Sequence, residues 1–251
     1  MAGLNAKKLQ NDPRVAQAKK LISAALADAQ SQIVAPQSAI PELKQCYAEW
    51  LKRAGAARGA NIYYPYLGSG LGNGALVELA DGSVKYDFIT GIGVHYFGHS
   101  CPEIVNSSID AALSDTVLQG HLQQNTDQVE LMESFLGLAQ KNGSHLAHCF
   151  LTSSGAMANE NSLKLIFQKN SPANRVLAFH KCFAGRTMAL AQMTDKHAYR
   201  DGLPVAMEVD YLPFYDAADH QGSIDRALET LQSHLTRFPK SYAGMCFELI
   251  Q

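Results

Sequence analysis

The sequence predicts an α/β fold with a mixed, mainly parallel sheet, preceded by a helical N-terminal arm. Two observations favour this fold. Residues 12–33 and 41–57 show helical spacing of apolar side chains, and from residue 148 onward short apolar runs alternate with amphipathic helical segments. Such alternation is typical of parallel sheets covered by helices. With 251 residues, 47% of them hydrophobic, the chain is large enough to bury a core.

The N-terminal part is predicted to form two helices and a hairpin. Residues 12–33 place apolar side chains at helical spacing, with Pro13 in a first turn that tolerates it. A second helix is expected over residues 41–57. Residues 75–90 alternate apolar and polar side chains around an Asp81-Gly82 turn, which predicts a β-hairpin.

The glycine-rich stretch 67–76 precedes this hairpin. It contains a loose match to the dinucleotide-binding fingerprint, which by itself would suggest an NAD-dependent oxidoreductase. A true fingerprint opens a helix, whereas a hairpin strand follows here. We therefore interpret this stretch as a mobile loop.

The remaining elements follow from periodicity and from turn residues. Helices are expected over 103–118 and 127–143, the second ending at Gly143. Beyond them we expect strands over 148–153, 175–180, 205–212 and 242–250, and helices over 156–168 and 223–235.

Composition excludes several classes of protein. A net charge of −2 with scattered lysines gives neither a basic face for nucleic acid nor a polybasic patch for membranes. The five dispersed cysteines indicate a reducing compartment, and their spacing suits no metal site. No signal peptide and no apolar run of about 18 residues is seen. We expect a cytoplasmic protein.

The segment 149–167 carries the first chemical signal. A predicted strand runs into two serines and a glycine, and a helix begins at once, so the backbone N–H groups near Gly155 and Ala156 face outward at a helix N-terminus. That arrangement can bind phosphate. The lysine of a P-loop is absent, which favours the phosphate of a held cofactor over that of a nucleotide. The alternative is that Ser153 or Ser154 only caps the helix.

Two further segments narrow the interpretation. Residues 180–195 place Phe183 and Arg186 on a loop at the end of the next strand, where α/β folds bind ligands, and residues 86–104 join a strand to a helix through glycines and histidines. Together with 149–167, these motifs resemble the class III (subgroup II) pyridoxal-phosphate-dependent aminotransferases, the group of acetylornithine, ornithine and 4-aminobutyrate aminotransferases. The resemblance runs over residues 79–251 in collinear order.

The resemblance implies a fold, a cofactor and site residues. The fold would be the large domain of the aspartate-aminotransferase type (fold type I), and the cofactor pyridoxal 5'-phosphate. Ser154, Gly155 and Ala156 would hold its phosphate, and Phe183 would stack on its ring. Glu248, which matches the glutamate of the family's E-P-x-Q-G strand end, would lie near the polar edge of the cofactor.

Several positions depart from the family pattern and bear on the identity of the substrate: Cys101, Met157, Ala184 and Leu249. The family's Schiff-base lysine and its acidic partner follow the strand that ends at Gln251, and neither Lys181 nor Lys240 matches the lysine's place. We therefore expect no catalytic residue within this chain, which by its length is expected to be an inactive part of a longer enzyme.

The predicted organisation has three parts: a helical arm and glycine-rich loop over 1–78, a hairpin and connection over 79–104, and the first part of the cofactor-binding domain over 105–251. The implied activity is transamination between an amino or ω-amino acid and a 2-oxo acid, by a homodimer. Two alternatives stay open. One is an aminomutase of the glutamate-1-semialdehyde type, and the other is a non-catalytic remnant that binds a partner.

Overall fold

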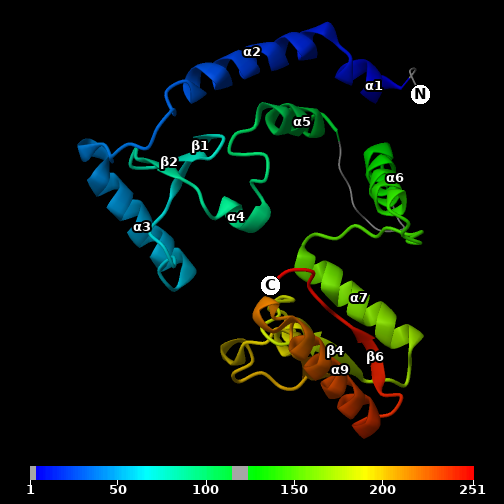
Figure 1. The fold of residues 1–251 in the computed structure, drawn as a ribbon. Coiled ribbons are helices and arrows are strands. Elements are labelled where there is room, and N and C mark those ends of the chain that lie inside the picture. The colour runs from blue at the N-terminus through cyan, green and yellow to red at the C-terminus, as the bar shows by residue number, and fades with distance from the viewer. Residues whose placement is uncertain (1–3, 115–123) are drawn as a thin grey trace. The chain divides into compact units, whose positions relative to one another are not determined.

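The computed structural model describes residues 4–114 and 124–251. Its contacts divide the chain into two compact units, Met1–Asn125 and Thr126–Gln251 (Figure 1). The three predicted segments are not these units, and their boundaries stay predictions. Each unit is described by itself.

The first unit begins with helices, as predicted. The short α1 (Asn5–Gln10) is followed by α2 (Pro13–Gln30), whose first turn is capped because the Asp12 side chain accepts a 2.8 Å hydrogen bond from the Arg14 N–H. After the 3-10 turn η1 (Pro41–Leu43), α3 (Lys44–Arg58) ends at Gly59 in a left-handed conformation.

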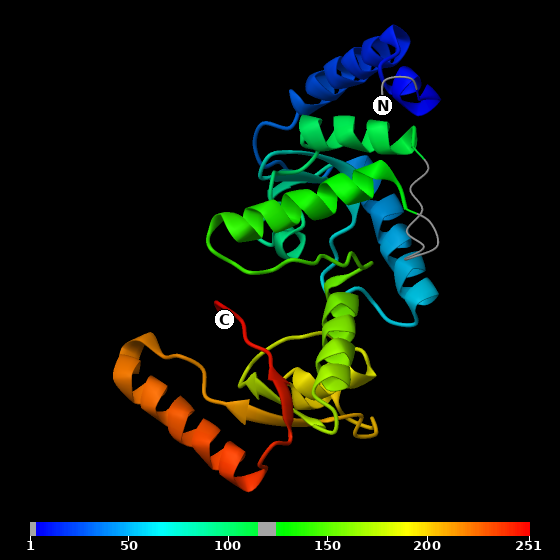
Figure 2. The ribbon, with the colours of Figure 1, turned by 90° about the vertical axis from the view of Figure 1, so that its right-hand side faces the viewer.

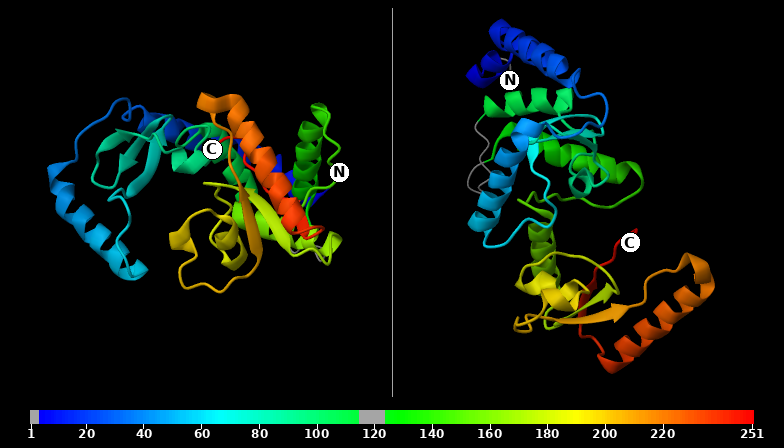
Figure 3. Two further views of the ribbon diagram at one scale, coloured as in Figure 1. Left: turned by 60° about the horizontal axis from the view of Figure 1, so that its bottom comes forward. Right: turned by 90° about the vertical axis from the view of Figure 1, so that its left-hand side faces the viewer.

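Helix α5 (Pro102–Ala112) packs beside α2, as the right-hand panel of Figure 3 shows. An ion pair of 2.7 Å between Lys19 Nζ and Asp110 Oδ2 joins the two helices. The predicted helix 103–118 is confirmed as far as Ala112, and residues 115–118 lie outside the described part of the chain.

The antiparallel sheet of the first unit has the order β1-β2-β3, with β1 (Gly68–Asn73), β2 (Leu76–Leu79) and β3 (Val84–Tyr86). The predicted hairpin is confirmed in β2 and β3. Its turn forms because Asp81 Oδ1 accepts the Ser83 N–H at 2.9 Å and Gly82 takes a φ of +76°. The short turn α4 (Thr90–Gly93) follows β3.

The interpretation of residues 67–76 as a mobile loop is wrong, because most of this stretch is strand β1, paired with β2. The register shifts between Gly68 and Gly72, which marks an irregularity of the bulge type. A Cβ at Gly72 would lie 2.5 Å from the Leu76 carbonyl oxygen and would collide with the His99 side chain. The glycine therefore permits close approach of a neighbouring strand.

The second unit has the alternating elements that the sequence predicts. Three parallel strands lie in the order β5-β4-β6, with β4 (Arg175–Phe179) in the centre, β5 (Glu208–Leu212) and β6 (Tyr242–Met245). Figure 2 shows the red β6 running toward the C-terminus. The helices and turns are α6 (Thr126–Lys141), α7 (Gly155–Lys169), α8 (Met188–Met193), η2 (His197–Tyr199), η3 (Ala217–Asp219) and α9 (His220–Arg237).

Two predicted strands are corrected. Residues 148–153 form no strand, since no described segment pairs with them, and Phe150 is 66% exposed. The predicted strand 242–250 ends at Met245, although the Cys246 N–H still donates to the Leu177 carbonyl at 2.9 Å. Beyond it Leu249 is 89% exposed, so its apolar character does not mark a buried strand.

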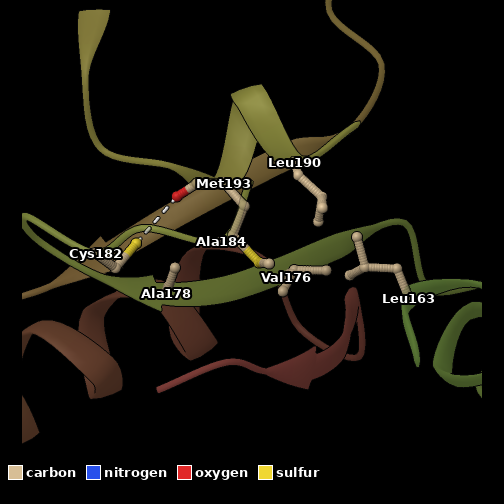
Figure 4. Packing of buried hydrophobic residues seen from close by; sticks show 7 residues of the cluster. All are labelled: Leu163, Val176, Ala178, Cys182, Ala184, Leu190 and Met193. Atoms are coloured by element: carbon tan, nitrogen blue, oxygen red, sulfur yellow. Dashed lines mark hydrogen bonds between the residues drawn. The ribbon is translucent and has the colours of Figure 1, made fainter. Parts of the chain in front are cut away.

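The core of the second unit lies between β4 and the helices α7 and α8 (Figure 4). Val176 and Ala178 of β4 meet Leu163 of α7, and Leu190 and Met193 of α8. Burial of each large aliphatic side chain contributes roughly 1.5–3 kcal/mol. This packing fixes the N-terminus of α7 and the loop after β4 on one rigid support. No described helix is both long and apolar enough to cross a membrane.

Candidate functional site

The N-terminus of α7 is the first component of the candidate site. Ser154 is the N-cap residue, and its Oγ accepts the Met157 N–H at 3.2 Å. The cap leaves the hydroxyl proton of Ser154 free to donate. Among the described residues no acceptor is seen for the N–H groups of Gly155 and Ala156, which the first turn of a helix leaves unpaired. The cap and the anion-binding geometry are therefore both present.

The loop that follows β4 is the second component. Within residues 183–187, Ala184 and Gly185 are buried, whereas the Phe183 ring is 55% exposed. Three side chains hold this loop. The Thr194 hydroxyl bonds its main chain, Asn159 Nδ2 donates to the Ala184 carbonyl at 2.8 Å, and Thr187 donates to the Glu160 carboxylate.

These two components line one cavity of about 490 Å³. This volume lies within the range of small-molecule pockets, roughly 300–1,000 Å³. The cavity is bordered by the α7 N-terminus, Asn159 and the loop: Gly155, Ala156, Asn159, Phe183, Ala184, Gly185, Arg186 and Thr187. Unpaired amides and a guanidinium thus lie beside an exposed aromatic ring. This set of groups fits a flat, phosphorylated cofactor, because the amides and cation suit the phosphate and the ring suits stacking.

Glu248 reaches the same loop from the segment after β6. Its Oε1 accepts the Phe183 N–H at 3.3 Å. The structure therefore brings Glu248 to the main chain of Phe183, although Glu248 does not line the cavity. Burial, followed by the charge of Glu248, raises the pKa of the nearby Cys246 thiol. Lys181 and Lys240 are exposed.

Asp195 contacts the residues at the start of the loop that follows β4. Its Oδ2 accepts the Lys181 N–H at 2.9 Å and lies 3.1 Å from His180 Nδ1, and its Oδ1 lies 3.6 Å from the Arg200 guanidinium. Burial raises the pKa of Asp195, but the hydrogen bonds from Lys181 and His180 outweigh this and lower it. The carboxylate is therefore ionised near neutral pH and positions the turn at Lys181, whose φ is +64°.

Tyr199 is an aromatic neighbour of Phe183. The two rings meet edge to face with centroids 6.4 Å apart. The cationic groups of Arg186 and Lys196 lie 5.9 and 4.8 Å from the Tyr199 ring centroid. Two cationic side chains therefore lie near the aromatic neighbour of Phe183, and their positive charge favours an anionic ligand nearby.

A second cavity, of about 340 Å³, lies in the first unit within the segment 74–99. There His99 Nε2 lies 2.7 Å from Asp87 Oδ2, and the His95 ring stacks on His99 at 4.2 Å. Burial raises the pKa of Asp87, but bonds from His99 and from the Thr90 and Ile89 amides lower it overall. The histidines of the 86–104 motif are thus gathered at one place.

Sequence reasoning missed Thr194, Asn159 and Glu160 as parts of the site. Asn159 and Glu160 lie one helical turn beyond the predicted anion site, and this spacing could have indicated them. Nothing in the sequence marks Thr194, because only the folding of the segment after α8 against the loop brings its hydroxyl there.

Comparisons with known proteins identify the family of the chain. The family model "Aminotransferase class-III" matches residues 65–251. An acetylornithine aminotransferase of Shewanella oneidensis is 30% identical over 161 residues, and one of Bacillus subtilis is 33% identical over 168 residues, covering 61% and 63% of this chain. The chain spans 38% and 41% of the length of these two relatives.

Solved structures share the fold. The taurine:2-oxoglutarate aminotransferase of Bifidobacterium kashiwanohense, in complex with PLP and glutamate, is 17% identical and superimposes with a TM-score of 0.64. The match covers 76% of this chain and 43% of that one. The predicted fold class, the type I fold of these aminotransferases, is confirmed.

Proposed function

Because the chain belongs to the class III aminotransferase family, we propose that it supplies part of the cofactor site of a pyridoxal-phosphate-dependent aminotransferase. The cofactor of this family is pyridoxal 5'-phosphate. When bound, its pyridine ring accepts the electrons released when a bond to the substrate Cα breaks. The observation that carries the proposal is the cavity in which the free amides of α7 meet the exposed Phe183 ring.

The phosphate of the cofactor is assigned to the N-terminus of α7. The N–H groups of Gly155 and Ala156 donate to it, and the free hydroxyl proton of Ser154 adds a third donor. The positive end of the helix dipole favours the negative charge of the phosphate. Arg186, on the same cavity wall, strengthens this preference.

The pyridine ring is assigned to Phe183, whose exposed face offers an offset-stacking surface. Glu248 has two tasks in this proposal. It holds the Phe183 main chain, and it places a carboxylate beside the loop, toward the polar edge of the cofactor. No catalytic residue is assigned among residues 1–251.

The proposed reaction transfers an amino group from an amino or ω-amino acid to a 2-oxo acid, and the proposed assembly is a homodimer. The test uses the protein that contains this chain, supplied with pyridoxal 5'-phosphate, 2-oxoglutarate and, in turn, acetylornithine, ornithine and 4-aminobutyrate. We expect glutamate to form with at least one donor and sedimentation to give the mass of two chains. If no donor yields glutamate above a control without cofactor, transamination of these substrates is excluded.

A further inference from the structure

We propose that Thr194 is a positioning residue for the loop 183–187, and that its buried hydroxyl fixes the main chain that presents the Phe183 ring. The inference rests on the proposed function, because it concerns the same cofactor site. Thr194 itself lines no part of the cavity and follows α8 in the chain. Its influence on a ligand would therefore pass through the loop.

The hydroxyl of Thr194 uses its full hydrogen-bonding capacity on this loop. Its Oγ1 accepts the N–H groups of Ala184 at 3.0 Å and Gly185 at 3.3 Å, and it donates to the Gly185 carbonyl at 2.8 Å. A hydroxyl offers one donor and two acceptor sites, so all three are occupied. Thr194 is only 1% exposed, and water therefore cannot replace these bonds without rearrangement of the core.

These bonds determine the backbone conformation of Gly185. Both its N–H and its carbonyl are tied to Thr194, and its φ is +138°, in the region that favours glycine. On the other side of Phe183, the Cys182 Sγ donates to the Met193 carbonyl at 3.1 Å (Figure 4), and the Cys182 carbonyl accepts the Asp195 N–H at 3.0 Å. Phe183 is thus exposed between two anchored residues.

The anchored loop is also fixed relative to the phosphate-binding turn. The Ala184 carbonyl accepts from Asn159, which lies on α7 one turn beyond Gly155. A site held in its binding conformation loses less entropy when a ligand arrives. Loss of the Thr194 hydroxyl should free the Ala184–Gly185 peptide, and the Phe183 ring would then lose its fixed distance from the α7 amides.

The test compares Thr194→Val, which keeps the shape but removes the hydroxyl, with Thr194→Ser, which keeps the hydroxyl. Ser223→Ala is the matched control. Ser223 is also 1% exposed in the same unit, and its Oγ accepts the Asp216 N–H at 3.1 Å and donates to the His220 carbonyl at 3.0 Å. The probe is pyridoxamine 5'-phosphate, because it has no aldehyde that could react with surface lysines.

We expect Thr194→Val to raise the dissociation constant of the probe about fivefold or more, which corresponds to a loss of about 1 kcal/mol of binding free energy as the loop becomes less well fixed. Thr194→Ser should bind within about twofold of the unaltered chain, and Ser223→Ala should bind as the unaltered chain does. If Thr194→Val binds as tightly as the unaltered chain, the inference is overturned while the proposed function stands.

A second readout needs no ligand. In the unaltered chain, hydrogen exchange at the amides of Ala184 and Gly185 should be slow, and Thr194→Val should accelerate it about tenfold, with Thr194→Ser restoring protection. Fast exchange in the unaltered chain overturns the inference. If the unaltered chain shows slow exchange but no saturable binding of the probe, the proposed function fails. Thr194 then stabilises the loop without any effect on ligand binding.

Discussion

Gly185 is a residue at which the loop tolerates little change. Its φ is +138°, and an added Cβ would lie 2.7 Å from Leu190 Cδ1 and 3.2 Å from the Ala156 Cβ. Leu190 is fully buried in the core, so a shift of its side chain would disturb the packing of the core. One small residue therefore joins the core to the wall of the candidate site.

The first prediction concerns this glycine. Gly185→Ala should lower the free energy of unfolding by about 2 kcal/mol, because it combines an unfavourable φ with a close contact in the core. Urea unfolding measures the change. Gly137→Ala is the control, since Gly137 lies exposed on α6 with nothing within 4 Å of the added Cβ, and it should be neutral or stabilising. A cost at Gly185 no larger than at Gly137 would contradict the described loop.

A charged network on the three parallel strands involves Arg175, Asp210 and Tyr242. Arg175 Nε lies 2.7 Å from Asp210 Oδ2, and the Tyr242 hydroxyl donates to the same oxygen at 2.7 Å. Burial, then the bond to Asp210, raises the pKa of Tyr242 to about 12 from 10.0. Burial also raises the pKa of Asp210, but the bonds from Arg175 and Tyr242 lower it overall.

The second prediction follows from the sign of the Tyr242 shift. The folded chain favours the protonated phenol, so its contribution to stability is complete below pH 10 and is lost as the pH rises through about 12. Tyr242→Phe should cost about 2 kcal/mol at pH 7, as expected for a bond to a charged group. The variant should also show a shallower fall in stability between pH 10 and 12.

Unfolding free energies measured across this pH range test that prediction. The slope should be reduced and not abolished, because burial also raises the pKa of Tyr211 to about 12. An unchanged slope in Tyr242→Phe would contradict this prediction, because it would mean that the Tyr242 phenol has the same pKa in the folded and the unfolded chain.

At the scale of elements, the N-terminus of α7 has two roles that can be separated. Ser154 caps the helix, and the same turn offers free amides to an anion. A negatively charged residue at the capping position would still cap the helix, but its charge would repel a bound anion.

The third prediction uses that separation. Ser154→Ala should lower the free energy of unfolding by about 1 kcal/mol through loss of the cap. Ser154→Asp should keep the stability of the unaltered chain, because aspartate caps well and suits the helix dipole, yet it should weaken binding of pyridoxamine 5'-phosphate by charge repulsion. Urea unfolding and a binding titration give the two values. Equal binding by Ser154→Asp and the unaltered chain would place the phosphate elsewhere.

The elements also show which features of the fold could be predicted. Helix α7 and strand β4 follow from local periodicity and were expected nearly to the residue. The strand expected at 148–153 fails because an apolar run becomes a strand only beside a partner, and none of the described segments pairs with it. Strand β1 was missed because glycines carry no side-chain pattern, and its pairing depends on the close approach of Leu76.

The candidate site could also be predicted only in part, because local motifs mark some of its residues and long-range packing brings in the others. Gly155, Ala156 and Phe183 were expected from motifs, and the structure brings them to one cavity. Thr194 could not be expected, because its role depends on long-range packing between the segment after α8 and the loop. Glu248 was expected near the cofactor, and the contact that the structure adds is its bond to the Phe183 amide.

At the scale of the whole molecule, the family match over residues 65–251 extends into both units, whereas the candidate cofactor site lies within the second unit alone. The second unit therefore contains the donors proposed for the phosphate and the ring proposed for stacking. Its binding function can be examined without assigning any role to the first unit.

The central claim is that the second unit binds the phosphorylated cofactor between the N-terminus of α7 and Phe183. The most direct test is an NMR titration of the 251-residue chain with pyridoxamine 5'-phosphate. We predict saturable shifts of the Gly155 and Ala156 amide signals, together with shifts of the Phe183 ring. Excess inorganic phosphate should reverse the ring shifts, whereas the two amides should stay shifted by the phosphate that replaces the probe. Saturable shifts confined to the 74–99 cavity, or none at Gly155 and Ala156, would contradict the account.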